Sequence, residues 1–297
     1  MKNPVKTRRE FIKKSASAAA AGLLYLNFGD KAFGSSEKKS RVVLIRDENV
    51  LDKLNKPHAD IVQNMLDEAT TALFDVDNPT KAWQQIIKPE DVVGIKTNVW
   101  RYLSTTSAVE NAIQKRLLEA GVDSQNISIN DRGVRSDPIF QKATALINAR
   151  PLRTHHWSGV GTLIKNHIMF AKSPSKYHPD SCADLAKVWS LPTVKNKTRL
   201  NILVMFTPLF HGIGPHHFSP KYTWAYNGLL VGTDPVAVDA VGVRILQEKR
   251  NQFFKEDRPL NPPPKHIFLA DTRHHLGTAD PAKIELIKLG WDKDSLI

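Results

Sequence analysis

Residues 91–98 read DVVGIKTN, a short apolar run that ends on three polar side chains. The apolar part is typical of a buried strand, and the KPE segment before it is typical of a turn. The polar end comprises Lys96, Thr97 and Asn98. Ligands of open α/β sheets bind at the carboxyl ends of parallel strands. We therefore expect Lys96 and Asn98 to contribute to a binding site at such an edge.

Apolar runs and helical patterns alternate on both sides of this segment. The other expected strands cover residues 41–47, 126–131, 149–157, 200–205 and the start of 229–243. The expected helices cover residues 58–74, 106–121, 177–189 and the end of 229–243, with shorter ones near Trp83 and after Ser136. In the tail we expect a short strand near His266 and a helix over 281–289. This alternation predicts one α/β domain over residues 35–297, with a mainly parallel or mixed sheet covered by helices on both faces, in a Rossmann-like three-layer architecture.

Composition narrows the class of protein. The chain has 297 residues, is 41% hydrophobic and 24% charged, and carries a net charge of +12. This excess suits an anionic ligand, whereas the lack of a basic helix or nucleic-acid motif predicts no nucleic-acid partner. With Cys182 as the single cysteine, an intramolecular disulfide and a four-cysteine iron–sulfur cluster are excluded. Any divalent metal would take its ligands from His, Asp and Glu.

The first 34 residues are typical of an export signal. The basic segment TRREFIKK at 7–14 precedes a weakly apolar run to Leu26 and small residues at 32–34. Arg8 and Arg9, followed by Phe11, resemble the twin-arginine pattern. That resemblance implies the twin-arginine machinery as a partner, a periplasmic or otherwise exported location, and no stable membrane anchor if the signal is cleaved. The alternative is a basic helix that happens to contain two arginines.

Residues 154–167, THHWSGVGTLIKNH, contain many polar side chains and two glycines within a short segment. Gly159 and Gly161 permit close approach of a ligand, Lys165 supplies a positive charge, and Asn166 can donate and accept hydrogen bonds. These residues predict a cradle for a small anion. A flexible glycine-containing surface loop is the alternative, because the spacing fits no complete phosphate-binding fingerprint.

Eleven histidines are present, several of them in this stretch and in a second glycine-rich loop at 211–217. Imidazole is a common metal ligand, so His155 and His211 are the candidate ligands of a metal. Their spacing matches no compact metal motif, and the site would have to be assembled from separate loops. We expect the ends at 96–98, 154–167 and 211–217 to converge.

Two acidic residues are candidates for the site. Asp239 lies in an apolar segment, where an unpaired carboxylate is costly. It is interpreted as a general base or ligand, or alternatively as a structural partner of Arg244 or Lys165. Asp234 is a candidate ligand-binding residue, although its position before Pro235 is also typical of a helix N-cap.

Several of these patterns, in this order, resemble the domain of unknown function family 362 over about residues 41–289. The segments that carry the resemblance are VGIKTN at 93–98, RTH at 153–155, GTLIKN at 161–166, His178, GIGP at 212–215 and LVGTDPVAVDA at 230–240. The resemblance implies an α/β domain, joined in some relatives to ferredoxin-like modules, and implies no particular reaction. This chain has Arg153 where the family often has Lys, and His211 near the place of an acidic residue.

The leading functional hypothesis is an exported, metal- or anion-dependent enzyme that acts on a small polar substrate, with Lys165 and Asp239 as its catalytic residues. The alternative is a non-catalytic metal-binding or accessory protein of an exported redox complex.

Overall fold

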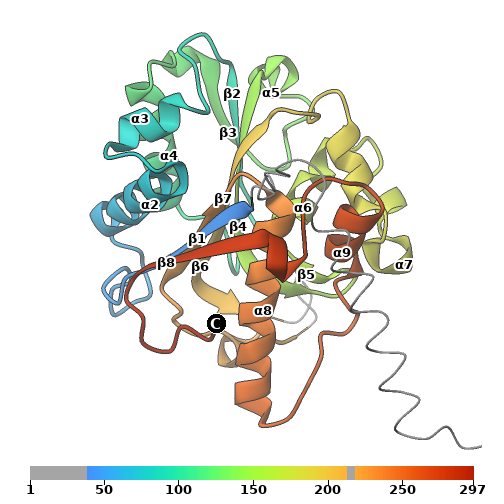
Figure 1. Cartoon of the computed structure of the whole chain (residues 1–297). Coiled ribbons are helices and arrows are strands. Elements are labelled where there is room, and N and C mark those ends of the chain that lie inside the picture. The colour runs from blue at the N-terminus through green and yellow to red at the C-terminus, as the bar shows by residue number, and fades with distance from the viewer. Residues whose placement is uncertain (1–38, 213–217) are drawn as a thin grey trace, which may run out of the picture. The chain divides into compact units, whose positions relative to one another are not determined.

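A computed structural model describes residues 39–212 and 218–297 (Figure 1). The expected signal at 1–34 and most of the glycine-rich loop at 211–217 lie outside the described residues. The described part contains an eight-stranded sheet in the order β3-β2-β4-β6-β7-β1-β8, with β5 paired to β4. The strands are β1 (Ser40–Arg46), β2 (Val93–Lys96), β3 (Ile127–Asn130), β4 (Ala145–His155), β5 (Gly159–Gly161), β6 (Thr198–Leu209), β7 (Gly228–Gly232) and β8 (Ile284–Gly290).

The sheet is mostly parallel. β7 runs antiparallel to both β6 and β1, and β5 runs antiparallel to β4. The other neighbouring pairs are parallel. The carboxyl ends of β2, β3, β4 and β6 therefore point to the same edge, which is where a ligand site is expected in such a sheet.

Helices cover both faces of the sheet (Figure 1). One face packs against α2 (Ala59–Phe74), α3 (Pro79–Gln84) and α4 (Ser107–Glu119), which share one hydrophobic cluster with the strands. The other face packs against α5 (Pro138–Lys142), α6 (Leu163–Asn166), α7 (Pro179–Cys182), α8 (Pro235–Phe254) and α9 (Lys265–Thr272). This three-layer α/β arrangement confirms the expected fold class. Within residues 39–212 and 218–297, the search for a helix long and apolar enough to cross a membrane finds none.

Alternation along β2 determines where its polar end lies. Val93 and Ile95 belong to the cluster beneath α2 and α4. Successive side chains of a strand point to opposite faces, so Gly94 and Lys96 face the other layer. A Cβ at Gly94 would lie 2.7 Å from the Phe140 ring. Glycine is therefore required there by packing, and Lys96 is buried below the layer that contains α6.

Helix α8 begins as expected at Asp234. Its carboxylate accepts hydrogen bonds from the backbone nitrogens of Val236 and Ala237, at 2.8 and 3.1 Å. It also accepts from the Ser40 hydroxyl at 2.8 Å and from the Thr278 nitrogen at 2.9 Å. The N-cap interpretation of Asp234 is confirmed, and the residue additionally ties β1 and the C-terminal segment to α8.

Three local predictions were wrong. Residues 281–289 form a short 3-10 turn and then edge strand β8, because the alternating apolar residues of IELIKLG pair with β1. The segment after His266 is helix α9 rather than a strand. The helix expected over 177–189 is broken, since Asp180, Ser181 and Cys182 have positive φ angles of 50°, 55° and 64°. In the first of these segments, pairing with β1 outweighed the local helix propensity.

Candidate functional site

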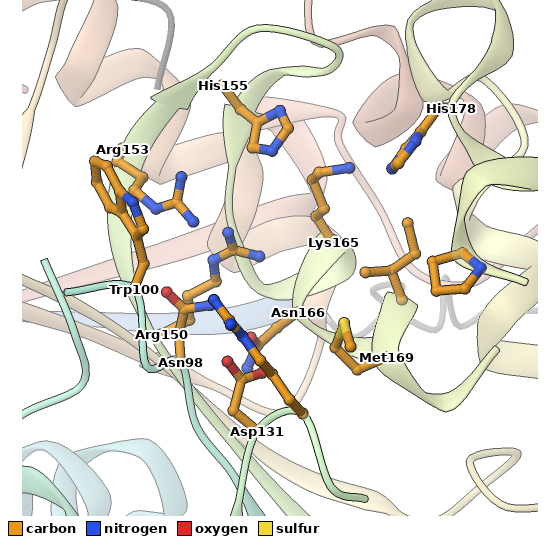
Figure 2. Close-up of a pocket in the computed structure, with 13 residues that line it drawn as sticks. Asn98, Trp100, Asp131, Arg150, Arg153, His155, Lys165, Asn166, Met169 and His178 are labelled. Carbon is orange, nitrogen blue, oxygen red and sulfur yellow. The ribbon is translucent and has the colours of Figure 1, made fainter. Parts of the chain in front are cut away.

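A pocket of about 230 Å³ opens at the carboxyl ends of β2, β3 and β4 (Figure 2). Asn98 and Trp100 follow β2, and Asp131 follows β3. The long strand β4 contributes Arg150, Arg153 and His155, while α6 contributes Lys165 and Asn166. This volume is below the range of about 300–1,000 Å³ that is common for drug-sized ligands, so the pocket suits a small molecule.

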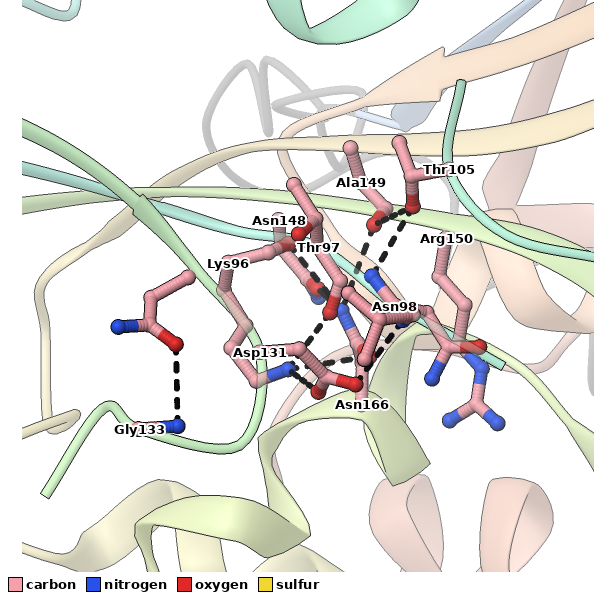
Figure 3. A network of polar contacts seen from close by, with 12 residues as sticks. Lys96, Thr97, Asn98, Thr105, Asp131, Gly133, Asn148, Ala149, Arg150 and Asn166 are labelled. Atoms are coloured by element: carbon pink, nitrogen blue, oxygen red, sulfur yellow. Dashed lines mark hydrogen bonds and ion pairs between the residues drawn. The ribbon is translucent and has the colours of Figure 1, made fainter. Parts of the chain in front are cut away.

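The floor of the pocket is a buried ion pair (Figure 3). The Lys96 ammonium donates to Asp131 Oδ1 at 2.5 Å, to the Thr97 carbonyl at 2.7 Å and to Asn166 Oδ1 at 3.4 Å. Burial acts to raise the pKa of Asp131, but the charge and hydrogen bond of Lys96, the Val99 nitrogen and the charge of Arg150 together outweigh it, so this pKa is lowered. Asp131 Oδ2 also accepts from the Val99 nitrogen at 3.0 Å. The pair thereby fixes residues 97–99, which follow β2, to Asp131, which follows β3.

Amides extend this floor across the sheet. Asn166 Nδ2 donates to Asn148 Oδ1 at 2.9 Å, and Asn148 Nδ2 donates to Asn201 Oδ1 at 3.0 Å. Asn201 Nδ2 in turn donates to the Thr233 carbonyl at 3.1 Å. All three asparagine side chains are buried, and each amide has a partner, as buried polar groups require. Asn166 is thus fixed to the sheet at the bottom of the pocket.

Three cations surround the pocket without a carboxylate partner. Arg150, Arg153 and Lys165 are all at least 96% buried, with exposed fractions of 4%, 4% and 3%. None of the three forms an ion pair with any residue in the described part of the chain. Arg150 donates to the Thr162 carbonyl at 3.4 Å, Arg153 lies over the Trp100 ring at 4.4 Å, and both have guanidinium nitrogens with no hydrogen-bond partner. Asp131 acts on both arginines, and Asp239 on Arg150, through electrostatic attraction without an ion pair. Buried charges are normally paired directly, so these three cations lack a direct counter-charge.

The Lys165 amine has an unusual environment. Its hydrogen-bond partner is Cys182 Sγ at 3.6 Å, and burial raises the pKa of this thiol, which keeps it neutral. Burial lowers the pKa of Lys165 to about 8, and the charges of Arg150 and Arg153 act in the same direction. At neutral pH a minor fraction of Lys165 is therefore the neutral amine, which is far more than for an ordinary exposed lysine.

Aromatic rings form the rim. Trp157 stacks on His178 with 3.9 Å between ring centroids, and its backbone nitrogen donates to His155 Nδ1 at 3.2 Å. Burial lowers the pKa of His178 to about 4 and lowers that of His155 further. Both imidazoles are therefore neutral and add no charge to the pocket. Figure 2 shows the Lys165 amine pointing toward His178, with Arg150 and Arg153 on the opposite side.

The structure brings together part of the predicted site. Asn98, His155, Lys165 and Asn166 line the pocket, and Lys96 lies directly under it. Of the three segments expected to converge, the first two, at 96–98 and 154–167, therefore lie at the same pocket. For the third, residues 213–217 lie outside the described residues.

The two acidic candidates lie outside the pocket. Asp234 caps α8, as described above. Asp239 bonds to neither Arg244 nor Lys165, so the alternative of a structural ion pair with one of them was wrong. Its carboxylate accepts from Thr162 Oγ1 at 2.7 Å and from the nitrogens of Leu163 and Ile164 at 2.9 Å each. Burial raises the pKa of Asp239 to about 7, against the effect of these donors. Asp239 therefore holds the first turn of α6 in place.

The two histidines proposed as metal ligands do not share the pocket. His211 lies beside Arg250, with 3.2 Å between its Nδ1 and the guanidinium, and packs against Tyr222 and Phe254. His155 lines the pocket. Across residues 39–212 and 218–297, no group of three or more His, Cys, Asp or Glu side chains is placed to hold a metal ion. Metal binding stays a prediction.

The two glycines of the cradle serve packing. Gly159 has a φ of +73°, and a Cβ there would lie 2.3 Å from the Pro262 carbonyl oxygen. At Gly161 a Cβ would lie 2.7 Å from the Arg150 guanidinium. Gly159 therefore admits a backbone contact, and Gly161 leaves room for the Arg150 side chain, which lines the pocket.

Gly159→Ala is expected to lower the free energy of unfolding by about 1–3 kcal/mol, because it combines backbone strain with a clash against main chain. The matched variant Gly161→Ala meets the movable end of Arg150 and is expected to cost less stability. Urea denaturation of both variants checks this. Equal losses for the two variants would contradict the distinction.

Sequence reasoning missed the two arginines of β4. Asn148 and Arg150 share one face by the two-residue period of a strand, but Arg153 does not fit that period. A register irregularity between Pro151 and Arg153 lets both arginines reach the same pocket. The available signal was two arginines inside a segment expected to be a buried strand, where an unpaired charge is costly.

Fold and site together define a three-layer α/β protein with a cationic pocket at the carboxyl edge of its sheet. The chain belongs to the family described as Domain of unknown function (DUF362), whose model matches residues 60–244. The matched region includes every residue that lines the pocket. Comparison with curated proteins gives no match, and neither does comparison with solved structures.

Proposed function

We propose that the pocket binds a small anion and that the protein is an exported, anion-dependent enzyme in which Lys165 takes part in the reaction. The observation that carries this proposal is the set of three buried cations, Arg150, Arg153 and Lys165, without carboxylate partners in the described residues. A bound carboxylate or phosphate would accept hydrogen bonds from the free guanidinium nitrogens and balance the charge.

The export part of the proposal is supported by the twin-arginine-like segment at 7–14 and the apolar run after it. It places the protein in the periplasm or outside the cell, with the twin-arginine machinery as its partner. A non-catalytic carrier would use the same cationic pocket. Enzymatic chemistry is favoured by one further feature, the Lys165 amine, whose pKa is lowered to about 8 and which is placed opposite the two guanidiniums.

Anion binding can be measured by calorimetry on the purified protein with phosphate, lactate and succinate. We expect at least one of them to bind, and Arg153→Gln to weaken that binding by about tenfold to a hundredfold, as expected for the loss of a charged hydrogen bond worth about 1.5–3 kcal/mol. Arg244→Gln, at an exposed position on α8, serves as the control and should leave binding unchanged.

The stability of the same variant separates a binding role from a structural one. Because Arg153 has no anionic partner in the ligand-free protein, Arg153→Gln removes an unbalanced buried charge and should not destabilise the fold. A strong loss of stability together with unchanged anion affinity would show that Arg153 is structural and would contradict the proposed function.

A further inference from the structure

We infer that Lys165 forms an imine with a small oxo acid whose carboxylate is held by Arg150 and Arg153. The inference rests on the proposed function and names the substrate class of the same pocket. It requires an anion site and a nucleophilic amine at opposite ends of one small cavity. Figure 2 shows this arrangement, with the guanidiniums on one side and the Lys165 amine on the other.

The cavity limits the ligand. At about 230 Å³ it admits a molecule of a few carbon atoms. A ligand that only needed charge neutralisation would be served by the two arginines, since guanidiniums bind carboxylates in a bidentate manner. The third cation is a lysine, whose compact amine can lose its proton and attack carbon, which a guanidinium does not do.

The surroundings of Lys165 lower its pKa and so increase the fraction of neutral amine. The groups around it are Arg150, Arg153 and His155 from β4, His178 and Cys182 from the segment at α7, and the buried His266 from α9. The histidines are neutral, the thiol is protonated, and the arginines repel a further positive charge. A lysine that is desolvated and lies next to other cations is a recognised nucleophile toward carbonyl carbon.

Lys96 provides an internal contrast. It is the other buried lysine at this edge, but it is paired with Asp131 and donates to two further oxygens. Burial lowers the pKa of Lys96 to about 8 as well, so the contrast lies in position: Lys96 is held by these bonds under the pocket floor, whereas Lys165 lines the pocket itself. We expect Lys165, and not Lys96, to react.

The step is balanced without a redox partner. The nitrogen lone pair of neutral Lys165 forms a bond to the carbonyl carbon, and the carbonyl π pair moves to oxygen. Two protons leave nitrogen in sequence and reach that oxygen, which departs as water while the C=N bond forms. The neutral imidazole of His178 faces the amine and is the group placed to carry a proton between nitrogen and oxygen.

The test is reductive trapping on the purified protein. Pyruvate, 2-oxobutyrate and 2-oxoglutarate are each added with sodium cyanoborohydride, and digested peptides are analysed by mass spectrometry. We expect a reduced adduct on the peptide that contains Lys165 with at least one of these acids. Lys165→Arg should abolish the adduct, whereas Lys172→Arg, at an exposed lysine, should keep it. Peptide mapping of the unmodified sequence identifies the reacting lysine even if Lys165→Arg does not fold.

The outcomes distinguish the two proposals. An oxo acid that binds by calorimetry, competes with lactate and gives no adduct at Lys165 overturns the imine and leaves the anion site intact. An adduct on Lys96, or one spread over exposed lysines, also overturns it. If neither oxo acids nor phosphate, lactate and succinate bind, both the imine and the proposed function fail.

Discussion

Asp131→Ala is expected to lower the free energy of unfolding by about 3–5 kcal/mol, because it leaves the Lys96 ammonium buried with no counter-charge. Lys96 is fully buried, and Asp131 supplies its negative partner at 2.5 Å. The variant also removes the acceptor of the Val99 nitrogen. Since the pKa of Asp131 in the folded protein lies below its ordinary value of 3.8, this stabilisation is present at neutral pH and is lost only as the pH falls below that value.

Urea denaturation measures this loss as a shift of the midpoint at constant slope. The double variant Lys96→Met with Asp131→Leu is the matched control. It removes both charges, and such replacements are often neutral or stabilising, so it should recover most of the stability lost in Asp131→Ala. A single variant that loses less than about 1 kcal/mol would behave like an exposed pair and would contradict the role assigned to the pocket floor.

Local patterns in the sequence were sufficient for most of the sheet, apart from β5 and β8, and for one side of the site. The apolar strand that ends on Lys96 and the LIKN segment of α6 are both short. In each, the polar residues stand at the end of the element, so their role in a site could be predicted from local sequence alone. Asn98, Lys165 and Asn166 therefore appear in the pocket as expected. The mainly parallel direction of the strands could also be predicted, because helices separate most of them along the chain.

The rest depended on contacts between distant segments. Arg153 reaches the pocket through a register irregularity in β4, which a two-residue period cannot reveal. Strand β8 forms because β1 offers it a free edge, although its sequence also suits a helix. His211 and Asp239 were selected for their residue type, and the fold gives them partners in other places.

Asp239→Ala is the second variant with a large expected effect. It would leave Thr162 Oγ1 and the nitrogens of Leu163 and Ile164 without an acceptor, all in a fully buried region. Each buried donor that loses its partner costs about 1–3 kcal/mol, so the free energy of unfolding should fall by about 3–5 kcal/mol. Thr162→Val removes one of the three bonds and keeps the carboxylate, so it should cost clearly less. Chemical denaturation of both variants checks the order.

These two variants, together with Asp239→Asn, decide between positioning and direct participation. Helix α6 has four residues, and Thr162, its N-cap, forms no side-chain cap of its own. Asp239 supplies that cap from α8 and thereby fixes the backbone that carries Lys165 and Asn166. Displacing this turn should weaken anion binding and imine trapping together, in proportion to the stability lost. A general base would behave differently: Asp239→Asn would then retain stability and anion affinity while the reaction disappeared. We expect the first pattern, because Asp239 bonds to the base of α6 and lies outside the pocket.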